Sequence, residues 1–464
     1  MKWDSEEELV DYAKELEYST VKDTNQRLSD NNKLVLKSIP DYSKQYSGKG
    51  RFGEFLEENY FGKENDTASK PDFAEVGVEL KAVPLTTREK GAVVKERIVL
   101  NKFRFCDIAR EHFATSHFLE KNAKLLFVFY FHDNALRPED KKIDIVELWS
   151  VLHHDIEQIR ADWQFIVDKI NAGKAHELSE GDTLYLGACT KGSTALASMQ
   201  IQPNSTIMAR GRALCFKISY ANMIYKLLSE NHQAREKEYK KSIYKGKDWI
   251  PLDGKIHQLT DKFIGMSGRE IYKHFNKPFN PNNKSAYAYA ARYMLGLYNQ
   301  SANYYEFEAA NIQIKSIRIE ENGNIEQSMS FKNVPFLEIN NQEWEDSQFY
   351  AELTSKFIMM IFKKIHDSDD YYFAGFFLWN MPEKDLDKAS IIWEETKKLV
   401  IAGDYEHFPG ATESKDIYNS ISHVRPKGQN GEDLMETPQG TREKKKCFWL
   451  NREYIIKVVK ENFR

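Results

Sequence analysis

The segment that decides the fold of this chain, residues 70–84, reads KPDFAEVGVELKAVP. Apolar residues at positions 76, 78, 80 and 82 alternate with Gly77, Glu79 and Lys81, which predicts a half-buried β-strand. Because side chains two residues apart in a strand project from the same face, Glu79 and Lys81 are expected to share one site. Asp72 lies seven residues before Glu79, far enough for a turn or a short strand to bring its carboxylate alongside.

This combination of charges suits the hydrolysis of a phosphodiester bond. The reaction needs a cation to offset negative charge in the transition state, an activated water and a donor near the phosphate. The carboxylates of Asp72 and Glu79 are hard ligands of the kind that Mg²⁺ prefers, and Lys81 can orient the water or help to deprotonate it. The spacing alone leaves a plainer interpretation open, in which Glu79 and Lys81 form the solvated face of an edge strand and Asp72 belongs to a turn.

The composition describes a folded protein without an overall excess of positive charge. Of the 464 residues, 41% are hydrophobic and 29% are charged, and this length predicts two domains. The formal net charge of −4 means that any DNA site must be a local basic surface. The four cysteines form no Cys-x-x-Cys pair, so their spacing indicates neither a zinc site nor a disulfide framework. An acidic N-terminus and the lack of an apolar run of about 18 residues predict a cytoplasmic protein.

The chain repeats itself at a separation of 230 to 234 residues. The same two intervals separate a pair of tryptophans and a glycine in each half: Trp149, Trp163 and Gly173 in the first, and Trp379, Trp393 and Gly403 in the second. Gly62 pairs with Gly296 in the same register, and Cys215-Phe216 pairs with Cys447-Phe448. Ordered matches along the whole chain predict a tandem duplication, with equivalent helices at 155–172 and 386–402.

Several segments closely resemble the MutH family of nucleases. They are residues 50–57 (GRFGEFLE), the segment 70–84, Thr115-Ser116-His117 and the Asp162-Trp163 helix. The two-lobed layout and residues 173–181 (GKAHELSEG) are similar to the restriction-enzyme branch of that family, which cuts DNA at GATC. The resemblance implies a mixed α/β fold of two tandem MutH-like restriction-endonuclease lobes, each a central mixed sheet flanked by helices. It also implies a Mg²⁺-dependent type II restriction endonuclease.

The resemblance assigns roles to five side chains of the first lobe. Asp72 and Glu79 would bind the metal ion, and Lys81 would be the catalytic lysine. Glu57 matches an additional acidic residue that is expected to help hold the metal or its water, although the neighbouring Glu58 leaves the register uncertain by one residue. Lys121 matches a lysine near the scissile phosphate. Glu57 as a surface charge of a helix, and Lys121 as a surface lysine, remain the alternatives.

The second lobe keeps little of this set. An offset of 234 residues places Glu306 opposite Asp72, Gln313 opposite Glu79, Lys315 opposite Lys81 and Ala291 opposite Glu57. A neutral amide and a methyl group cannot replace anionic ligands, so no productive divalent site is expected there. We therefore predict a catalytic lobe at 1–230, a charged linker at 231–250 and a catalytically inactive DNA-binding or regulatory lobe at 251–464.

Candidate DNA contacts lie in both lobes. In the second, residues 423–430 (HVRPKGQN) resemble the base-reading loop of the family, where Arg425 can pair with guanine, Gln429 can pair with adenine, and Lys427 lies between them. Lys191 is the corresponding position in the first lobe. Arg210 and Arg212 are candidates for phosphate contacts. The alternative for both loops is an exposed connection with ordinary polar residues.

The expected partners follow from the same resemblance. They are double-stranded DNA that contains GATC, a second copy of the chain in a DNA-induced homodimer, and a cognate DNA methyltransferase as a genetic partner. Two other functions stay open from the sequence. One is a MutH-like nicking endonuclease of mismatch repair, and the other is a non-catalytic DNA-binding regulator.

Overall fold

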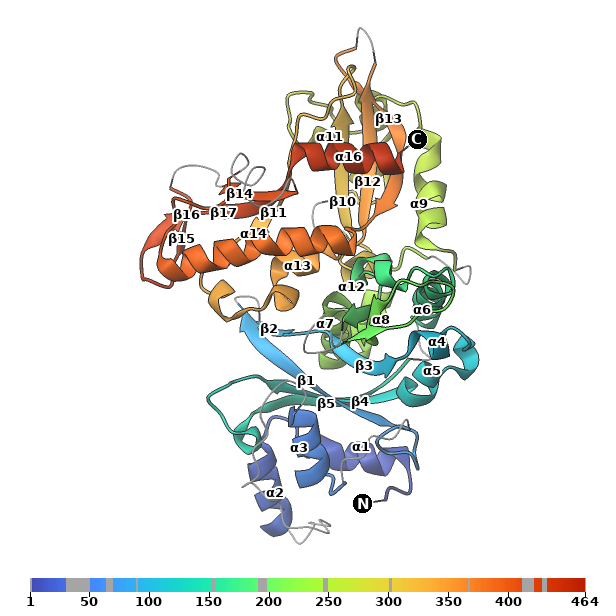
Figure 1. The fold of residues 1–464 in the computed structure, drawn as a ribbon, viewed down its shortest axis with the longest axis vertical. Helices are drawn as coiled ribbons and strands as arrows, with labels where there is room; N and C mark the ends of the chain where they lie inside the picture. Colours follow the sequence, from blue (N-terminus) through green and yellow to red (C-terminus); the bar gives the residue numbers. More distant parts are fainter. Residues whose placement is uncertain are drawn as a thin grey trace. The chain divides into compact units, whose positions relative to one another are not determined.

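The computed structural model divides the chain into two compact units (Figure 1). It describes residues 2–30, 51–63, 70–88, 91–151, 155–190, 198–244, 249–299, 303–365, 368–410, 421–427 and 432–463. The first unit comprises Met1–Leu178 and Thr183–Lys241, and the second comprises Ser179–Asp182 and Ser242–Arg464. The boundary at Lys241 falls inside the range 231–250 that was expected to connect the lobes. That range also contains the helix α8 (His232–Tyr239).

The first unit is built on a mixed sheet in the order β2-β1-β4-β5. Its strands are β1 (Glu79–Arg88), β2 (Gly91–Val94), β4 (Lys124–Phe131) and β5 (Ile143–Ser150). β1 runs parallel to β4, starting from the pair Glu79 and Leu125, whereas the other two pairings are antiparallel. β2 pairs with β1 only from Leu85 onward, so the segment of β1 that carries Glu79 and Lys81 lies beyond this pairing.

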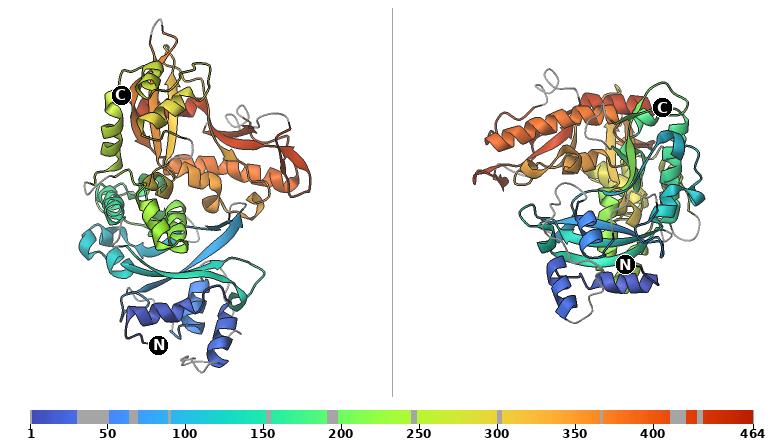
Figure 2. Two further views of the ribbon diagram at one scale, coloured as in Figure 1. Left: turned by 180° about the vertical axis from the view of Figure 1, so that it is seen from behind. Right: turned by 60° about the horizontal axis from the view of Figure 1, so that its bottom comes forward.

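Helices cover both faces of this sheet, as Figures 1 and 2 show. α1 (Glu6–Lys14) contacts β5 and α3 (Arg51–Asn59) contacts β1 on one face, while α7 (Ile218–Ser229) packs on the other. Apolar side chains of the helices, including Leu9 and Phe55, share one buried core with Leu80 and Leu126 of the strands. This packing fixes the strand β1 against α3 and thereby sets the framework of the candidate site.

The first unit also contains a second sheet and further helices. An antiparallel sheet in the order β3-β9-β6 contains β3 (Ile98–Phe103), β9 (Arg212–Phe216) and β6 (Leu186–Thr190). β7 (Met199–Gln200) and β8 (Ala209–Arg210) make a short ribbon. The other helices are α2 (Val21–Asp30), α4 (Phe105–Ile108), α5 (His117–Asn122) and α6 (Ile156–Asn171).

The second unit repeats this arrangement. A mixed sheet β10-β12-β13 corresponds to β1-β4-β5, with a parallel pair and then an antiparallel pair; its strands are β10 (Gln313–Ile319), β12 (Phe357–Lys364) and β13 (Tyr371–Trp379). An antiparallel sheet β11-β17-β14 corresponds to β3-β9-β6; its strands are β11 (Met329–Asn333), β17 (Lys446–Leu450) and β14 (Ser422–Pro426). A ribbon of β15 (Leu434–Glu436) and β16 (Arg442–Lys444) completes the match.

The helices of the second unit surround these sheets. They are α9 (Leu252–Thr260), α10 (Gly268–His274), α11 (Ala286–Met294), α12 (Tyr305–Ala309), α13 (Gln348–Leu353), α14 (Glu383–Ala402) and α16 (Arg452–Asn462). α14 is the equivalent of α6, and it begins three residues before the predicted 386. Its C-terminal Gly403 has φ 74°, which matches φ 72° at Gly173 after α6. Among the described helices, none is both long and apolar enough to cross a lipid bilayer.

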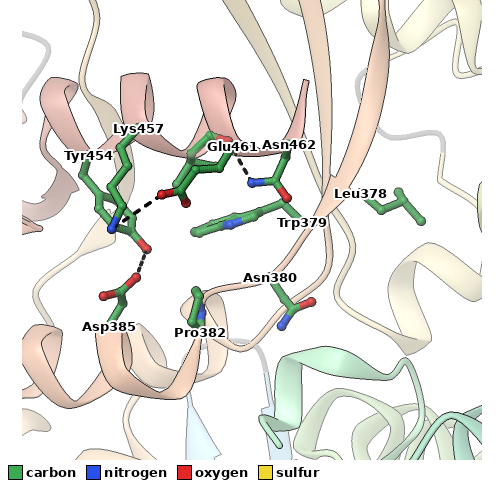
Figure 3. A pocket seen from close by; sticks show the side chains of 10 residues that line it. Leu378, Trp379, Asn380, Pro382, Asp385, Tyr454, Lys457, Glu461 and Asn462 are labelled. Carbon is green, nitrogen blue, oxygen red and sulfur yellow. Dashed lines mark hydrogen bonds and ion pairs between the residues drawn. The ribbon is translucent and has the colours of Figure 1, made fainter. Parts of the chain in front are cut away.

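A buried trio of side chains demonstrates how closely the two units correspond. Tyr454 donates a hydrogen bond of 2.8 Å to Asp385 beside Trp379, and a cavity of about 260 Å³ adjoins them (Figure 3). In the first unit Tyr220 donates to Asp155 at 2.8 Å. The tyrosine and tryptophan ring centroids are 6.2 Å apart in both units. The tandem repeat of mixed α/β lobes is therefore confirmed, with an antiparallel sheet beside each central mixed sheet.

Candidate active site

A tight turn places Asp72 beside the start of β1. Phe73 N–H donates to Val78 O at 2.8 Å, and Val78 N–H donates to Phe73 O at 3.1 Å. Gly77 closes the turn with φ 68°, a conformation that glycine adopts without steric cost. The strand consequently begins at Glu79, and the prediction that it begins at residue 76 is wrong. Alternating apolar residues continue through the turn, which explains why the pattern overextends the strand.

Asp72 and Glu79 contact each other as well as the backbone. The backbone N–H of Asp72 donates to Glu79 Oε2 at 3.1 Å, and Asp72 Oδ2 accepts a hydrogen bond of 3.0 Å from the N–H of Leu80. Glu79 is only 3% exposed, and this burial raises its pKa, with Asp72 adding to the effect while Lys81 opposes it. Two carboxylates are therefore held together in a place where they gain from a nearby cation.

Two lysines approach Glu79 from different elements. Lys81 follows on β1, and its Nζ lies 2.7 Å from Glu79 Oε1 because the two residues share one face of the strand. Lys121 comes from α5, which begins after Ser116, and its Nζ lies 3.5 Å from the same oxygen. Both lysine side chains are mostly buried. The structure thus brings together three of the predicted residues and places Lys121 with them.

Glu57 also faces this group, from the last turns of α3. Its Oε2 atom lies 3.8 Å from Nζ of Lys63, and the same ammonium lies 3.1 Å from Asp72 Oδ1. Burial, and then the Asp72 carboxylate, raise the pKa of Glu57 to about 7, against the opposing effect of Lys63. Sequence reasoning missed Lys63. The signal that could have found it is Gly62, which marks the C-terminal end of a helix that carries an acidic residue.

The donor set fits a divalent cation in kind. Glu57, Asp72 and Glu79 offer hard carboxylate oxygens, and Mg²⁺ normally keeps several waters and takes only one or two carboxylates. Within the described ranges, no three His, Cys, Asp or Glu side chains are already close enough to hold a metal ion together. Asp72 and Glu79 would therefore hold a bound cation, and Glu57 would be a further carboxylate beside it.

The equivalent place in the second unit has a different set of charges. Gln313 begins β10, and its amide donates to Asn311 Oδ1 at 3.0 Å. Glu306 aligns with Asp72 in the repeat. Its carboxylate accepts hydrogen bonds from Ser242 Oγ and from the N–H of Ile243, the first residues of the long segment of the second unit. Ala291 is buried in α11. Of the four residues equivalent to the predicted set, only Lys315 keeps its identity.

Lys315 is mostly buried, next to a backbone carbonyl and an aromatic ring. Its Nζ lies 3.4 Å from Ser330 O and 5.2 Å from the ring centroid of Phe331. Burial lowers its pKa to about 8, while Glu352 favours the charged form. Glu352 takes the place of Lys121, since both are the fifth residue of a helix capped by a serine, Ser116 in α5 and Ser347 in α13. The buried carboxylate beside the strand lysine thus comes from the strand itself in the first lobe, as Glu79, and from the helix α13 in the second, as Glu352.

The expected DNA contacts of the first lobe divide into two kinds. Arg210 is partly exposed on β8. Arg212 is 4% exposed, and its guanidinium donates to Ala188 O at 2.9 Å and to Leu178 O at 2.6 Å. The prediction that Arg212 contacts a phosphate is therefore wrong, because its guanidinium is buried and donates hydrogen bonds to backbone carbonyls of the same lobe. Lys191 lies outside the described residues.

In the second lobe Arg425 and Lys427 are exposed at the end of β14. The Arg425 guanidinium lies 3.7 Å from the ring centroid of Trp449, a stacking that holds its plane in one orientation. Lys427 Nζ donates to Phe331 O at 2.8 Å. Gln429 lies outside the described residues. The two described side chains remain candidates for DNA contacts.

Comparisons with known proteins point to one family. The family model described as DNA mismatch repair enzyme MutH matches residues 61–162 and 295–390, one segment in each lobe. The type II restriction enzyme Sau3AI of Staphylococcus aureus is 33% identical over 455 residues, which covers 87% of this chain and 91% of that protein. The DNA mismatch repair protein MutH of Yersinia enterocolitica is 26% identical over 174 residues, or 37% of this chain and 75% of that protein. MutH of Yersinia pestis is 26% identical over 171 residues, or 36% of this chain and 73% of that protein.

Proposed function

The chain belongs to the family of the DNA mismatch repair enzyme MutH and the restriction enzyme Sau3AI, and from this premise we propose that it is a type II restriction endonuclease. Its substrate is double-stranded DNA that contains GATC, and its cofactor is Mg²⁺. The observation that carries the proposal is the contact of Asp72, Lys81 and Lys121 with the single buried carboxylate of Glu79. Similarity to a restriction enzyme along 87% of the chain favours restriction over mismatch repair, where the similarity covers about a third of the chain.

Each side chain of the first-lobe site has a defined task in this proposal. Asp72 and Glu79 hold the cation, and Glu57 supports it or its water. Bound Mg²⁺ supplies positive charge against the phosphate and makes a coordinated water more acidic. Lys81, 2.7 Å from Glu79, would orient the attacking water as an ammonium donor, or, once it has lost its own proton, take the proton of that water on its amine. Lys121 enters from α5 and stabilises charge on the scissile phosphate.

The second lobe binds DNA without cleaving it in this proposal. Gln313 and Ala291 lack the anionic oxygens of Glu79 and Glu57, and both oxygens of Glu306 accept hydrogen bonds from Ser242 and Ile243. One cleavage centre per chain cuts one strand at a time. Two chains that assemble on DNA as a homodimer therefore make the double-strand break. A cognate methyltransferase protects the same sites in the host DNA.

The test uses the purified full-length chain, a supercoiled plasmid that contains GATC sites, and Mg²⁺. We expect linear fragments whose ends map to GATC, and no cleavage by Asp72→Ala although that variant still binds the plasmid. A plasmid of the same length without GATC is the control. Accumulation of nicked circles alone would favour a MutH-like nicking enzyme, and binding without any cleavage would favour a non-catalytic regulator.

A further inference from the structure

Lys63 is a third ammonium group in the first-lobe site, and its position follows from the way α3 ends. After the last helical residue, Asn59, Gly62 adopts φ 59°, which reverses the chain direction. The N–H of Lys63 then donates to Glu57 O at 2.8 Å. The backbone at Lys63 is thereby fixed against the helical turn that carries Glu57.

The Lys63 ammonium lies between two carboxylates that belong to different elements. It is 3.1 Å from Asp72 Oδ1 and 3.8 Å from Glu57 Oε2. The lysine side chain is 19% exposed and each carboxylate side chain is 16% exposed, so water screens their charges only partly. Like charges this close repel each other, and the lysine offsets that repulsion.

The second lobe supplies a comparison, because α11 is also followed by a glycine with positive φ but has alanine where α3 has Glu57. Gly296 has φ 79°, and the N–H of the next residue, Leu297, donates to Arg292 O at 2.8 Å. Leu297 is buried at 2% exposure where the first lobe has Lys63. The glycine turn is kept, although the hydrogen bond after it reaches back five residues here and six at Lys63. A buried leucine stands in place of the ammonium in the lobe that has Ala291 opposite Glu57. By contrast, the strand lysine is kept in both lobes.

We propose that Lys63 is an internal cation of this site, which neutralises Glu57 and Asp72 while no divalent cation is bound and competes with that cation for the same oxygens. Lys63 is thus a positioning residue that preserves the carboxylate cluster and sets the concentration of divalent cation at which the site fills. The inference rests on the proposed function in one respect, namely that these carboxylates bind a divalent cation.

The experiment measures Mn²⁺ binding to the full-length chain without DNA by titration calorimetry. Lys63→Met removes the charge and keeps the length of the side chain, and we expect it to bind Mn²⁺ about tenfold more tightly, since a competing charge about 3 Å from a ligand oxygen is gone. In EDTA the same variant should melt at a lower temperature than the wild type, and Mn²⁺ should raise its melting temperature by more.

The matched control is Lys22→Met, which removes a lysine from an ion pair of 3.6 Å with Asp140 on the surface of the same lobe. Its Mn²⁺ affinity should equal that of the wild type. If Lys63→Met does not fold, Lys63→Gln replaces it. Mn²⁺ binding by the Lys63 variant that is no tighter than wild type would overturn the inference. A loss of DNA affinity in EDTA with unchanged Mn²⁺ binding would also overturn it, since Lys63 would then be a phosphate contact. Absence of Mn²⁺ binding by the wild type, or binding by Asp72→Ala that equals that of the wild type, would instead refute the metal site, and with it the proposed function.

Discussion

The N-terminal ends of β1 and β10 have a similar backbone but carry different charges. Both strands run parallel to their neighbour in the same register, from Glu79 opposite Leu125 and from Gln313 opposite Phe357. Both follow a turn closed by a residue with positive φ, Gly77 in one case and Asn311 in the other. The fold therefore does not require the charges of the candidate site.

The charges differ in a coordinated way. In the first lobe the strand carries the carboxylate and α5 carries the lysine, Lys121. In the second lobe the strand carries an amide and α13 carries the carboxylate, Glu352, which favours the charged form of Lys315. A buried lysine needs some compensating negative charge, and either element can supply it. A divalent cation, however, needs at least one or two carboxylate ligands, and among the described residues at the two strand starts Asp72 and Glu79 of the first lobe supply them.

The largest expected effect on cleavage comes from replacing Glu79 by glutamine, the residue that the second lobe has at the equivalent position, Gln313. Glu79→Gln keeps the size of the side chain but removes the anionic ligand and the partner that Lys81 and Lys121 share. We expect plasmid cleavage to fall by at least about 1,000-fold, or about 4 kcal/mol of transition-state stabilisation. DNA binding in a gel-shift assay should be kept. Cleavage within tenfold of the wild type would mean that the contrast between Glu79 and Gln313 does not explain which lobe is active.

A second test uses pH, because only the first lobe has an acidic residue at position 57 or its equivalent. The pKa of Glu57 is raised to about 7, so between pH 4.5 and 7 the folded metal-free chain holds a proton that the unfolded chain releases. This carboxyl therefore costs increasing stability as pH rises through that window, up to roughly 3 kcal/mol. Glu57→Gln should remove this dependence.

The measurement is the melting temperature in EDTA from pH 4.5 to 8, taken as the difference between Glu57→Gln and wild type. The melting temperature of Glu57→Gln minus that of the wild type should increase as the pH rises. A difference that stays constant with pH would show that Glu57 does not titrate in this range. Glu54→Gln is the matched control, since Glu54 lies on the same helix and is more exposed, with Arg51 as its partner.

The buried trio of tyrosine, aspartate and tryptophan tests a feature that the two lobes share, where the earlier tests concern features in which they differ. Tyr220→Phe and Tyr454→Phe each remove a hydroxyl that donates to a buried aspartate at 2.8 Å. We expect each change to cost about 1–3 kcal/mol of stability in calorimetry. Cleavage below the melting temperature should stay close to the wild-type rate for both. A selective loss of cleavage in Tyr220→Phe would give this trio a catalytic role that its presence in both lobes argues against.

The smallest effect is expected at the surface of the second lobe. Arg425→Lys keeps the charge but loses the flat guanidinium that stacks 3.7 Å from the Trp449 ring centroid. Affinity for a GATC duplex should fall by about 1 kcal/mol, measured by fluorescence anisotropy in a Glu79→Gln background that prevents cleavage. Affinity for a duplex without GATC should change less. An equal loss for both duplexes would assign Arg425 to phosphate rather than base contacts.

Much of the fold and the centre of the site could be predicted from the sequence. The duplication followed from Trp163, Trp393 and their glycines, and these tryptophans are the buried anchors of equivalent helices. The shared face of Glu79 and Lys81 followed from the two-residue period of a strand. In contrast, Arg212 looked like a phosphate contact and is buried, because nothing in the local sequence reveals that β9 is the central strand of its sheet.

The sequence by itself determined which chemical groups are available and which neighbours share a face, since these depend on residue type and on the local period of the backbone. Only the tertiary structure decided which distant groups meet. Lys63 reaches Asp72 because Gly62 turns the chain at the end of α3, and Lys121 reaches Glu79 because α5 packs beside the sheet. Glu306 is directed to Ser242 and Ile243 instead of a metal site. Such contacts depend on how helices and sheets pack, and packing energy is shared among many residues rather than encoded at any one position.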